Sequence, residues 1–168
     1  IINRGEPAVR FLRAMREYNI ESDLCLQGIV FFTESDRYAP FVRQADEAVF
    51  LGEPMRTVEP KHRDAESSIS SDKELMVSAY CDHDYIRSLL KEHRCDAVWP
   101  GWGFVSEDPS FVKMLEEEGI VFIGPSSEAM YRLGDKIAAK YMAKACKVPL
   151  APWAELVDQD DSQTLLAK

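Results

Sequence analysis

The feature that most constrains the fold is an alternation of short apolar runs with helical patterns along almost the whole chain. Each run has the length of a strand, and the four runs are residues 28–32, 47–51, 97–99 and 120–123. Between them, apolar residues recur every three or four positions, as on one face of a helix. Continuous apolar strands that alternate with amphipathic helices are typical of a parallel sheet covered on both faces. The sequence therefore predicts an α/β fold built on a parallel sheet flanked by helices.

The chain begins with Ile1 and Ile2, which we interpret as the end of a further strand. Gly5 suits the turn that follows, and Pro7 suits the first turn of a helix, where its missing N–H costs nothing. Apolar residues then recur at helical spacing as far as Tyr18. Because only two strand residues precede the turn and the first residue is not Met, we expect the natural start to lie upstream.

The composition is that of a globular protein outside the membrane. Hydrophobic residues make up 46% of the chain and charged residues 29%, and no apolar stretch approaches the length of a membrane span. The 20 Lys and Arg residues are outnumbered by 29 Asp and Glu residues, which gives a formal charge of −9. Such a charge argues against nucleic acid as the main partner. The four cysteines lie far apart, which indicates free thiols in a reducing compartment, so we expect a cytoplasmic location.

The spacing of two cysteines and two histidines resembles that of a zinc site. Cys81 and His83 form a pair that is mirrored by His93 and Cys95. Structural zinc sites usually space their paired ligands by about two to four residues, whereas here a single residue separates each pair. The segment between the pairs also has a helical pattern, which would place them at opposite ends of a helix. We therefore predict no metal site.

Candidate chemistry concentrates after the third apolar run, in residues 100–107, which we call the glycine loop. Gly101 and Gly103 allow the backbone to turn sharply and to approach a ligand closely. Ser106 and Glu107 follow, with Ser106 predicted to cap the next helix. In open parallel sheets, ligands bind beyond the carboxyl ends of the strands, where such a loop lies. The alternative is a strand-to-helix turn without chemistry.

A second candidate is Lys136. Gly134 and Asp135 are predicted to form a turn and an N-cap, which places Lys136 in the first turn of the last helix. A cation is unfavourable there unless an anion is bound, since the helix N-terminus already carries partial positive charge. The alternative is a solvated stripe, because Lys140 and Lys144 continue the same spacing.

Two other classes of site fit poorly. Residues 3–6 stand where a dinucleotide-binding fold carries its glycine fingerprint, but they lack those glycines. Arg4 and Glu6 are predicted to pair locally instead. There is no Gly-x-Ser-x-Gly elbow of a hydrolase, and the histidines lie in polar or helical surface contexts: His62, His83 and His93.

The glycine loop resembles the Pro-Gly-aromatic-Gly-Phe-x-Ser-Glu loop of the biotin carboxylases, the ATP-dependent half of the biotin-dependent carboxylases. Further blocks of similarity occur in the same order along the chain: residues 3–6, 35–37, 45–49, 119–126 and 133–138. The resemblance implies that residues 1–125 form a Rossmann-like, pre-ATP-grasp domain. It also implies that residues 126–168 are a truncated helical connection into an ATP-grasp domain.

The resemblance assigns roles to individual residues. In the family, the lysine of the Gly-Asp-Lys segment contacts ATP phosphate, which implies the same for Lys136. The family's loop lines the cleft where biotin and bicarbonate meet the nucleotide, which implies a border made of Gly101, Trp102, Gly103 and Glu107. Arg10 and Arg13 match arginines near the interface of dimeric members, although a solvated helix face explains them almost as well. Trp102 replaces the tyrosine usual in bacterial subunits, so the acyl acceptor stays open.

Two segments depart from the family pattern. Residues 55–78 are polar and serine-rich, and they resemble a surface insertion, whose length a loop tolerates at modest entropic cost. We interpret this segment as a surface loop, with an element that binds a protein partner as the alternative. Residues 23–27 form a second, smaller departure.

The implied activity needs more than these residues. A biotin carboxylase uses ATP and Mg²⁺ to activate bicarbonate as carboxyphosphate and then carboxylates biotin, here within an acetyl-CoA or acyl-CoA carboxylase-type enzyme. The implied partners are the remaining ATP-grasp and C-terminal domains, a biotin carboxyl carrier, carboxyltransferase components and a second copy of the chain. In the family, the lid, the metal-binding glutamates and the catalytic residues lie further along, so we expect no activity from this chain alone. The alternatives are another ATP-grasp ligase, of the carbamoyl-phosphate-synthase type, and a non-catalytic binding or regulatory module.

Overall fold

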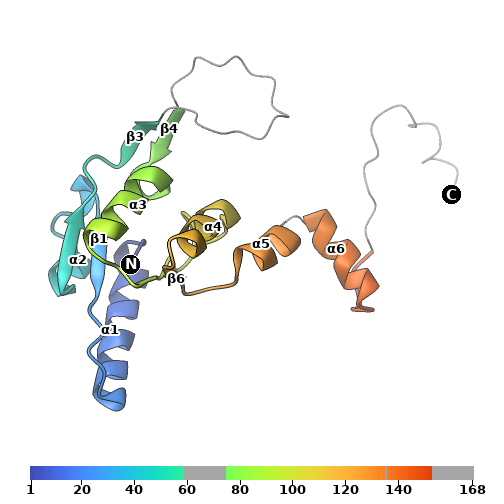
Figure 1. The fold of residues 1–168 in the computed structure, drawn as a ribbon, viewed down its shortest axis with the longest axis horizontal. Coiled ribbons are helices and arrows are strands. Elements are labelled where there is room, and N and C mark those ends of the chain that lie inside the picture. The colour runs from blue at the N-terminus through green and yellow to red at the C-terminus, as the bar shows by residue number, and fades with distance from the viewer. Residues whose placement is uncertain (59–74, 135, 153–168) are drawn as a thin grey trace, which may run out of the picture. The chain divides into compact units, whose positions relative to one another are not determined.

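A computed structural model describes residues 1–58, 75–134 and 136–152 (Figure 1). The chain divides into two compact units, Ile1–Tyr131 and Arg132–Lys168. Of the elements in the described residues, the first unit holds the strands and most of the helices. The sequence-based domain boundary after residue 125 stays a prediction.

A parallel sheet forms the centre of the first unit. Strand β1 (Ile29–Phe32) pairs in parallel with β2 (Glu47–Phe50), and β5 (Ala97–Val98) pairs in parallel with β6 (Val121–Phe122). The predicted parallel sheet is therefore confirmed.

Residues 1 and 2 join these two ladders, as expected for the end of a strand. The Ile1 amine donates to the Ile29 carbonyl at 2.7 Å, and the Phe31 N–H donates to the Ile1 carbonyl at 3.3 Å. On the other side, the Ile2 N–H donates to the Trp99 carbonyl at 3.0 Å. The spatial order is thus β2, β1, residues 1–2, β5 and β6, and the carboxyl ends of all these segments meet at one edge.

Helices cover both faces of the sheet because successive strand residues point to opposite sides. Phe31 packs in one buried cluster with residues of α3 (His83–Glu92) and α4 (Pro109–Glu117). Its neighbours Val30 and Phe32 pack in a second cluster with residues of α1 (Gly5–Ser22) and α2 (Pro40–Gln44). Two short 3₁₀ turns complete this part, η1 (Glu34–Asp36) and η2 (Ala79–Cys81).

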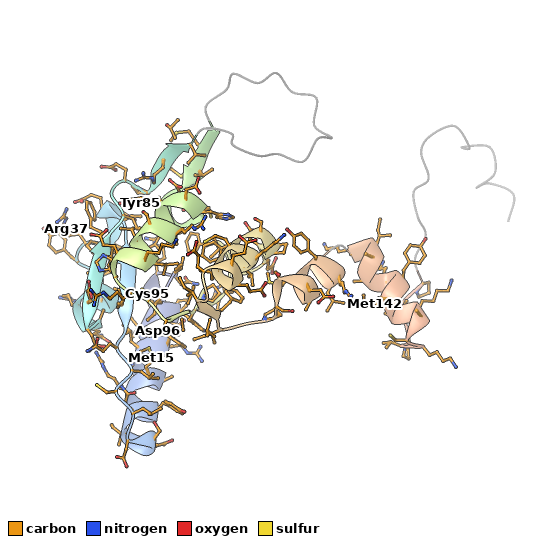
Figure 2. The ribbon with its side chains drawn as sticks, viewed as in Figure 1. Met15, Arg37, Tyr85, Cys95, Asp96 and Met142 are labelled. Atoms are coloured by element: carbon orange, nitrogen blue, oxygen red, sulfur yellow. The ribbon has the colours of Figure 1, made fainter. Side chains whose placement is uncertain are left out.

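The segment predicted as an irregular insertion begins and ends in strands. β3 (Met55–Val58) pairs antiparallel with β4 (Leu75–Ser78), with Met55 opposite Ser78. The prediction of a loop over the whole of residues 55–78 was therefore wrong at both ends, and residues 59–74 lie outside the described part. Arg56 of β3 links this pair of strands to α3, because its guanidinium donates to Asp82 at 2.9 Å and lies 3.8 Å from the centre of the ring of Tyr85, which is labelled in Figure 2.

The second unit begins within the helical region that the sequence predicts. Helix α5 (Ser127–Gly134) crosses the division between the units, and α6 (Lys136–Ala145) lies in the second one. Gly134 is the last residue of α5, so the predicted turn at this glycine was wrong, while Asp135 lies outside the described residues. No helix in the described part of the chain is long and apolar enough to span a membrane.

Candidate functional site

The glycine loop leaves β5 at the carboxyl edge of the sheet and turns through left-handed backbone. The φ angles are +64° at Gly101, +78° at Gly103 and +48° at Phe104. A Cβ at position 101 would lie 2.7 Å from Asn3 Nδ2 and 2.8 Å from an atom of the Trp99 ring. Position 101 therefore requires glycine for two separate reasons, its backbone angle and the close approach of its neighbours.

A buried asparagine from the first segment holds this turn. The Asn3 side-chain amide donates to the Pro100 carbonyl at 2.7 Å and to the Trp102 carbonyl at 2.9 Å. Its Oδ1 accepts a hydrogen bond from the Arg4 N–H at 2.8 Å. Asn3 is only 3% exposed. Asn3 lies in a block of family similarity and was given no role from the sequence, although a polar residue directly after an apolar strand end is a signal that could have singled it out.

The next residue, Arg4, forms a bidentate ion pair with Asp36 of η1. Both N–O distances are 2.6 Å, and Asp36 is buried. The predicted local pair between Arg4 and Glu6 was wrong, because Glu6 instead lies 3.4 Å from Arg10, one helical turn further along α1. The pairing with Asp36 links the carboxyl ends of residues 1–2 and of β1, a contact between segments 32 positions apart.

An aromatic pair supports the glycine loop from η2. The rings of Phe104 and Tyr80 lie 4.6 Å apart between centroids. The Tyr80 hydroxyl donates to the Phe31 carbonyl of β1 at 3.0 Å. Burial raises the pKa of this hydroxyl far above its usual value, and the nearby Asp36 carboxylate adds to the rise. Tyr80 therefore stays protonated and serves as a fixed support.

Two side chains of the loop face solvent where a ligand could reach them. Trp102 is 61% exposed, and Glu107 is also exposed. Four of the predicted site residues, Gly101, Trp102, Gly103 and Glu107, thus lie in one continuous loop. Their role at a biotin and bicarbonate cleft stays a prediction.

The helix after the loop, α4, has a different N-cap from the predicted one. Asp108, not Ser106, accepts hydrogen bonds from the N–H groups of Ser110 at 2.9 Å and Phe111 at 3.1 Å. It also lies 3.0 Å from His83 Nε2. Burial alone would raise the pKa of Asp108, but the hydrogen bonds from His83, Ser110 and the Phe111 N–H outweigh it and lower the pKa well below its usual range. Asp108 is the N-cap because it stands directly before the proline that begins α4.

The remaining predicted residues lie elsewhere. Lys136 is exposed in the first turn of α6, as predicted, in the second unit. Arg10 is exposed and paired with Glu6, and Arg13 is exposed on the same helix. The dimer role of these arginines and the phosphate role of Lys136 stay predictions.

The histidines of the zinc pattern have carboxylate partners. His83 pairs with Asp108, and His93 Nδ1 lies 2.5 Å from Glu47. Among residues 1–58, 75–134 and 136–152, no group of three or more His, Cys, Asp or Glu side chains could hold a metal ion.

A cavity of about 370 Å³ lies at the opposite edge of the sheet. It is lined by residues that begin β1 and β5, such as Ile29 and Ala97, and by Met15, Cys95 and Asp96 (labelled in Figure 2). Ligands of open parallel sheets bind beyond the carboxyl ends of the strands, whereas this cavity lies at the amino ends. The glycine loop therefore remains the better candidate.

Comparison with known proteins agrees with this arrangement. Residues 1–130 match the family described as biotin carboxylase, N-terminal domain. The chain is 31% identical over 165 residues to a biotin carboxylase of Halalkalibacterium halodurans, covering 98% of the chain and 31% of that protein. It is 33% identical over 155 residues to a pyruvate carboxylase of Bacillus subtilis, covering 92% of the chain and 11% of that protein.

A solved structure gives the same result at the level of the fold. The crystal structure of a biotin carboxylase–β,γ-ATP complex from Campylobacter jejuni matches with a TM-score of 0.69 and 31% identity, over 90% of this chain and 28% of that one. The chain thus spans about a third or less of the relatives it matches. The family match, the identities and the fold agree, and the chain belongs to the family of biotin carboxylase N-terminal domains.

Proposed function

We propose that this chain works as the N-terminal part of an ATP- and bicarbonate-dependent biotin carboxylase, in which biotin is carboxylated through carboxyphosphate. The observation that carries the proposal is the glycine loop, held at the carboxyl edge of a parallel sheet in a chain of this family. The final acceptor is left open, because the relatives include a pyruvate carboxylase and an acyl-coenzyme A carboxylase subunit.

The glycine loop would border the reacting groups. Gly101 and Gly103 carry no Cβ, so a ligand can approach their backbone closely. Trp102 offers an exposed aromatic face, and Glu107 offers an exposed carboxylate at the end of the loop. In this proposal these residues shape and orient the cleft, and none of them is assigned a covalent step.

Lys136 would bind an ATP phosphate. An exposed cation in the first turn of a helix is suited to this, because the helix dipole and the lysine attract the same anion. Bound Mg²⁺ would offset phosphate charge during phosphoryl transfer. By the family resemblance, we place the ligands of that metal further along the natural protein.

The same proposal covers location and partners. We place the enzyme in the cytoplasm, in keeping with four cysteines that are all free thiols. It would act with the remaining ATP-grasp and C-terminal domains, a biotin carboxyl carrier and carboxyltransferase components, and as a homodimer with Arg10 and Arg13 near the interface.

ADP release by the complete natural protein, with bicarbonate and Mg²⁺ and with or without free biotin, tests the function. We expect biotin to stimulate ADP release, and Lys136→Ala to reduce it at least tenfold through a higher KM for ATP. Lys144→Ala, two turns along α6, is the matched control and should change the rate less than twofold. ADP release that biotin does not alter would point to another ATP-grasp ligase, and a folded protein that releases no ADP would point to a binding module.

A further inference from the structure

We propose that Asn3 is a positioning residue for the carboxylation reaction, because it holds the Pro100–Trp102 turn in the conformation that meets the ligand. Asn3 touches no substrate in this view. It acts through the backbone of the glycine loop, which lies 97 to 99 positions away in the chain. The inference rests on the proposed function, since it is that function which places a ligand at the loop.

The hydrogen bonds of Asn3 fix the orientation of its amide. The two Nδ2 protons go to the carbonyls of Pro100 and Trp102, and Oδ1 accepts from the Arg4 N–H. The opposite orientation would place Oδ1 against two carbonyl oxygens and Nδ2 against an N–H donor. Because Asn3 is almost fully buried, water could not easily replace these partners if the side chain were lost.

Aspartate would be a poor substitute despite its equal size. It keeps an acceptor for the Arg4 N–H, but it presents a carboxylate oxygen to the carbonyls of Pro100 and Trp102. A buried carboxylate without a cation also costs stability whatever the role of the residue, so the melting temperature must show that each variant is folded in the assay. In folded protein, a loss of the biotin-dependent rate that exceeds the loss without biotin separates a role in holding the turn from a role in packing alone.

The backbone of the loop needs such support. Phe104 has a φ of +48°, a region that residues with side chains rarely adopt and that persists only where surrounding contacts hold it. Tyr80 packs against the Phe104 ring at one end of the turn. At the other end, the Asn3 amide donates a hydrogen bond to the Pro100 carbonyl. A shift of about 1 Å in a positioning element can cost about a hundredfold in rate, so loss of one support is expected to be visible in catalysis.

Gly101 is part of the same arrangement as Asn3. A Cβ there would lie 2.7 Å from Asn3 Nδ2, so a side chain at 101 would displace the asparagine from the turn. Asn3 and Gly101 thus depend on each other, because the missing side chain of Gly101 leaves room for the Asn3 amide.

The test compares Asn3→Ala, Asn3→Asp and wild type in the complete natural protein. For each we would measure kcat and KM for free biotin, ADP release without biotin, the melting temperature, and hydrogen–deuterium exchange over residues 100–107. Ile86→Val, a change in the core under α3, serves as the control for lost stability alone. We expect kcat/KM for biotin to fall at least tenfold in Asn3→Ala and further in Asn3→Asp. ADP release without biotin should fall less than the biotin-dependent rate, exchange in the loop should rise, and Ile86→Val should leave all of these near wild type.

The outcomes separate this inference from the proposed function. If biotin stimulates the wild type but Asn3→Asp keeps its kcat/KM, the positioning role is overturned while the function stands. Equal losses with and without biotin, or a loop whose exchange does not change, would also overturn it. If biotin stimulates no variant, wild type included, the proposed function fails and the catalytic role of Asn3 falls with it, whatever the exchange shows.

Discussion

At the scale of single residues, the carboxyl edge of the sheet is organised by contacts between segments far apart in sequence. Arg4 and Asp36 form the clearest case, because a guanidinium that is half in water meets a carboxylate that is 9% exposed. Hydrogen bonding to Asp36 raises the pKa of Arg4, so the guanidinium stays charged at any ordinary pH. The pair holds η1 beside the start of α1 and so frames the region next to the glycine loop.

Removal of this guanidinium should destabilise the fold measurably. Arg4→Ala leaves the buried Asp36 carboxylate without its charged donor, and we expect a loss of about 2 kcal/mol in the free energy of unfolding, in the range for a hydrogen bond to a charged group. Arg4→Lys keeps the charge but cannot form the bidentate pair, so it should lose about half as much. Urea unfolding at pH 7 measures both. A change below about 0.5 kcal/mol in Arg4→Ala would contradict this account.

Among the elements, those with strong local patterns were predictable. The runs around β1, β2, β5 and β6 were recognised because parallel strands covered on both faces are apolar throughout. β3 and β4 were not recognised, since their strand residues adjoin a highly charged stretch and are stabilised by pairing with each other. Of the candidate site, the sequence indicated the loop and its glycines. The polar residue after an apolar strand end could have singled out Asn3, but the sequence could not indicate the partners of Asn3 or Asp36, because these contacts depend on the tertiary fold.

The cap of α4 gives a prediction about pH. The pKa of Asp108 is lowered in the folded state, so between that value and the unfolded value of about 4 the unfolded chain binds more protons. The stability that Asp108 contributes is therefore complete above about pH 4 and is lost as the pH falls through the folded pKa. Asp108→Asn keeps a capping acceptor but does not titrate. The substitution should lower the free energy of unfolding by up to about 1 kcal/mol at pH 5.

The measurement is the difference in unfolding free energy between wild type and Asp108→Asn, from urea titrations at pH 5 and pH 3, a range below the ordinary titration of histidine, so that the contact with His83 does not add to the change. We expect the difference to shrink at pH 3. Other carboxylates with lowered pKa values, such as Glu116 and Glu118, are the same in both proteins and cancel in the difference. A difference that stays constant over this range would show that the charge of Asp108 adds nothing to the cap.

At the scale of the whole molecule, the sheet and the candidate nucleotide lysine belong to different compact units. The first unit has its own buried core on both faces of the sheet, which gives it the means to hold the glycine loop in place. Phosphoryl transfer needs more than a loop and a lysine, because metal ions must offset the phosphate charge and the nucleotide must be enclosed. The described residues provide no metal cluster, and the chain covers 31% of the biotin carboxylase to which it was compared.

We therefore expect residues 1–168, produced alone, to fold without releasing ADP. Urea unfolding followed by circular dichroism should show a cooperative transition, since both buried clusters of the first unit lie within residues 1–131. ADP release with bicarbonate, Mg²⁺ and biotin should stay at background, while the complete natural protein under the same conditions is active. Because the two readouts are independent, an unfolded fragment cannot be mistaken for an inactive one. Biotin-stimulated ADP release by the folded fragment would show instead that the metal ligands and the enclosure of the nucleotide lie within these 168 residues.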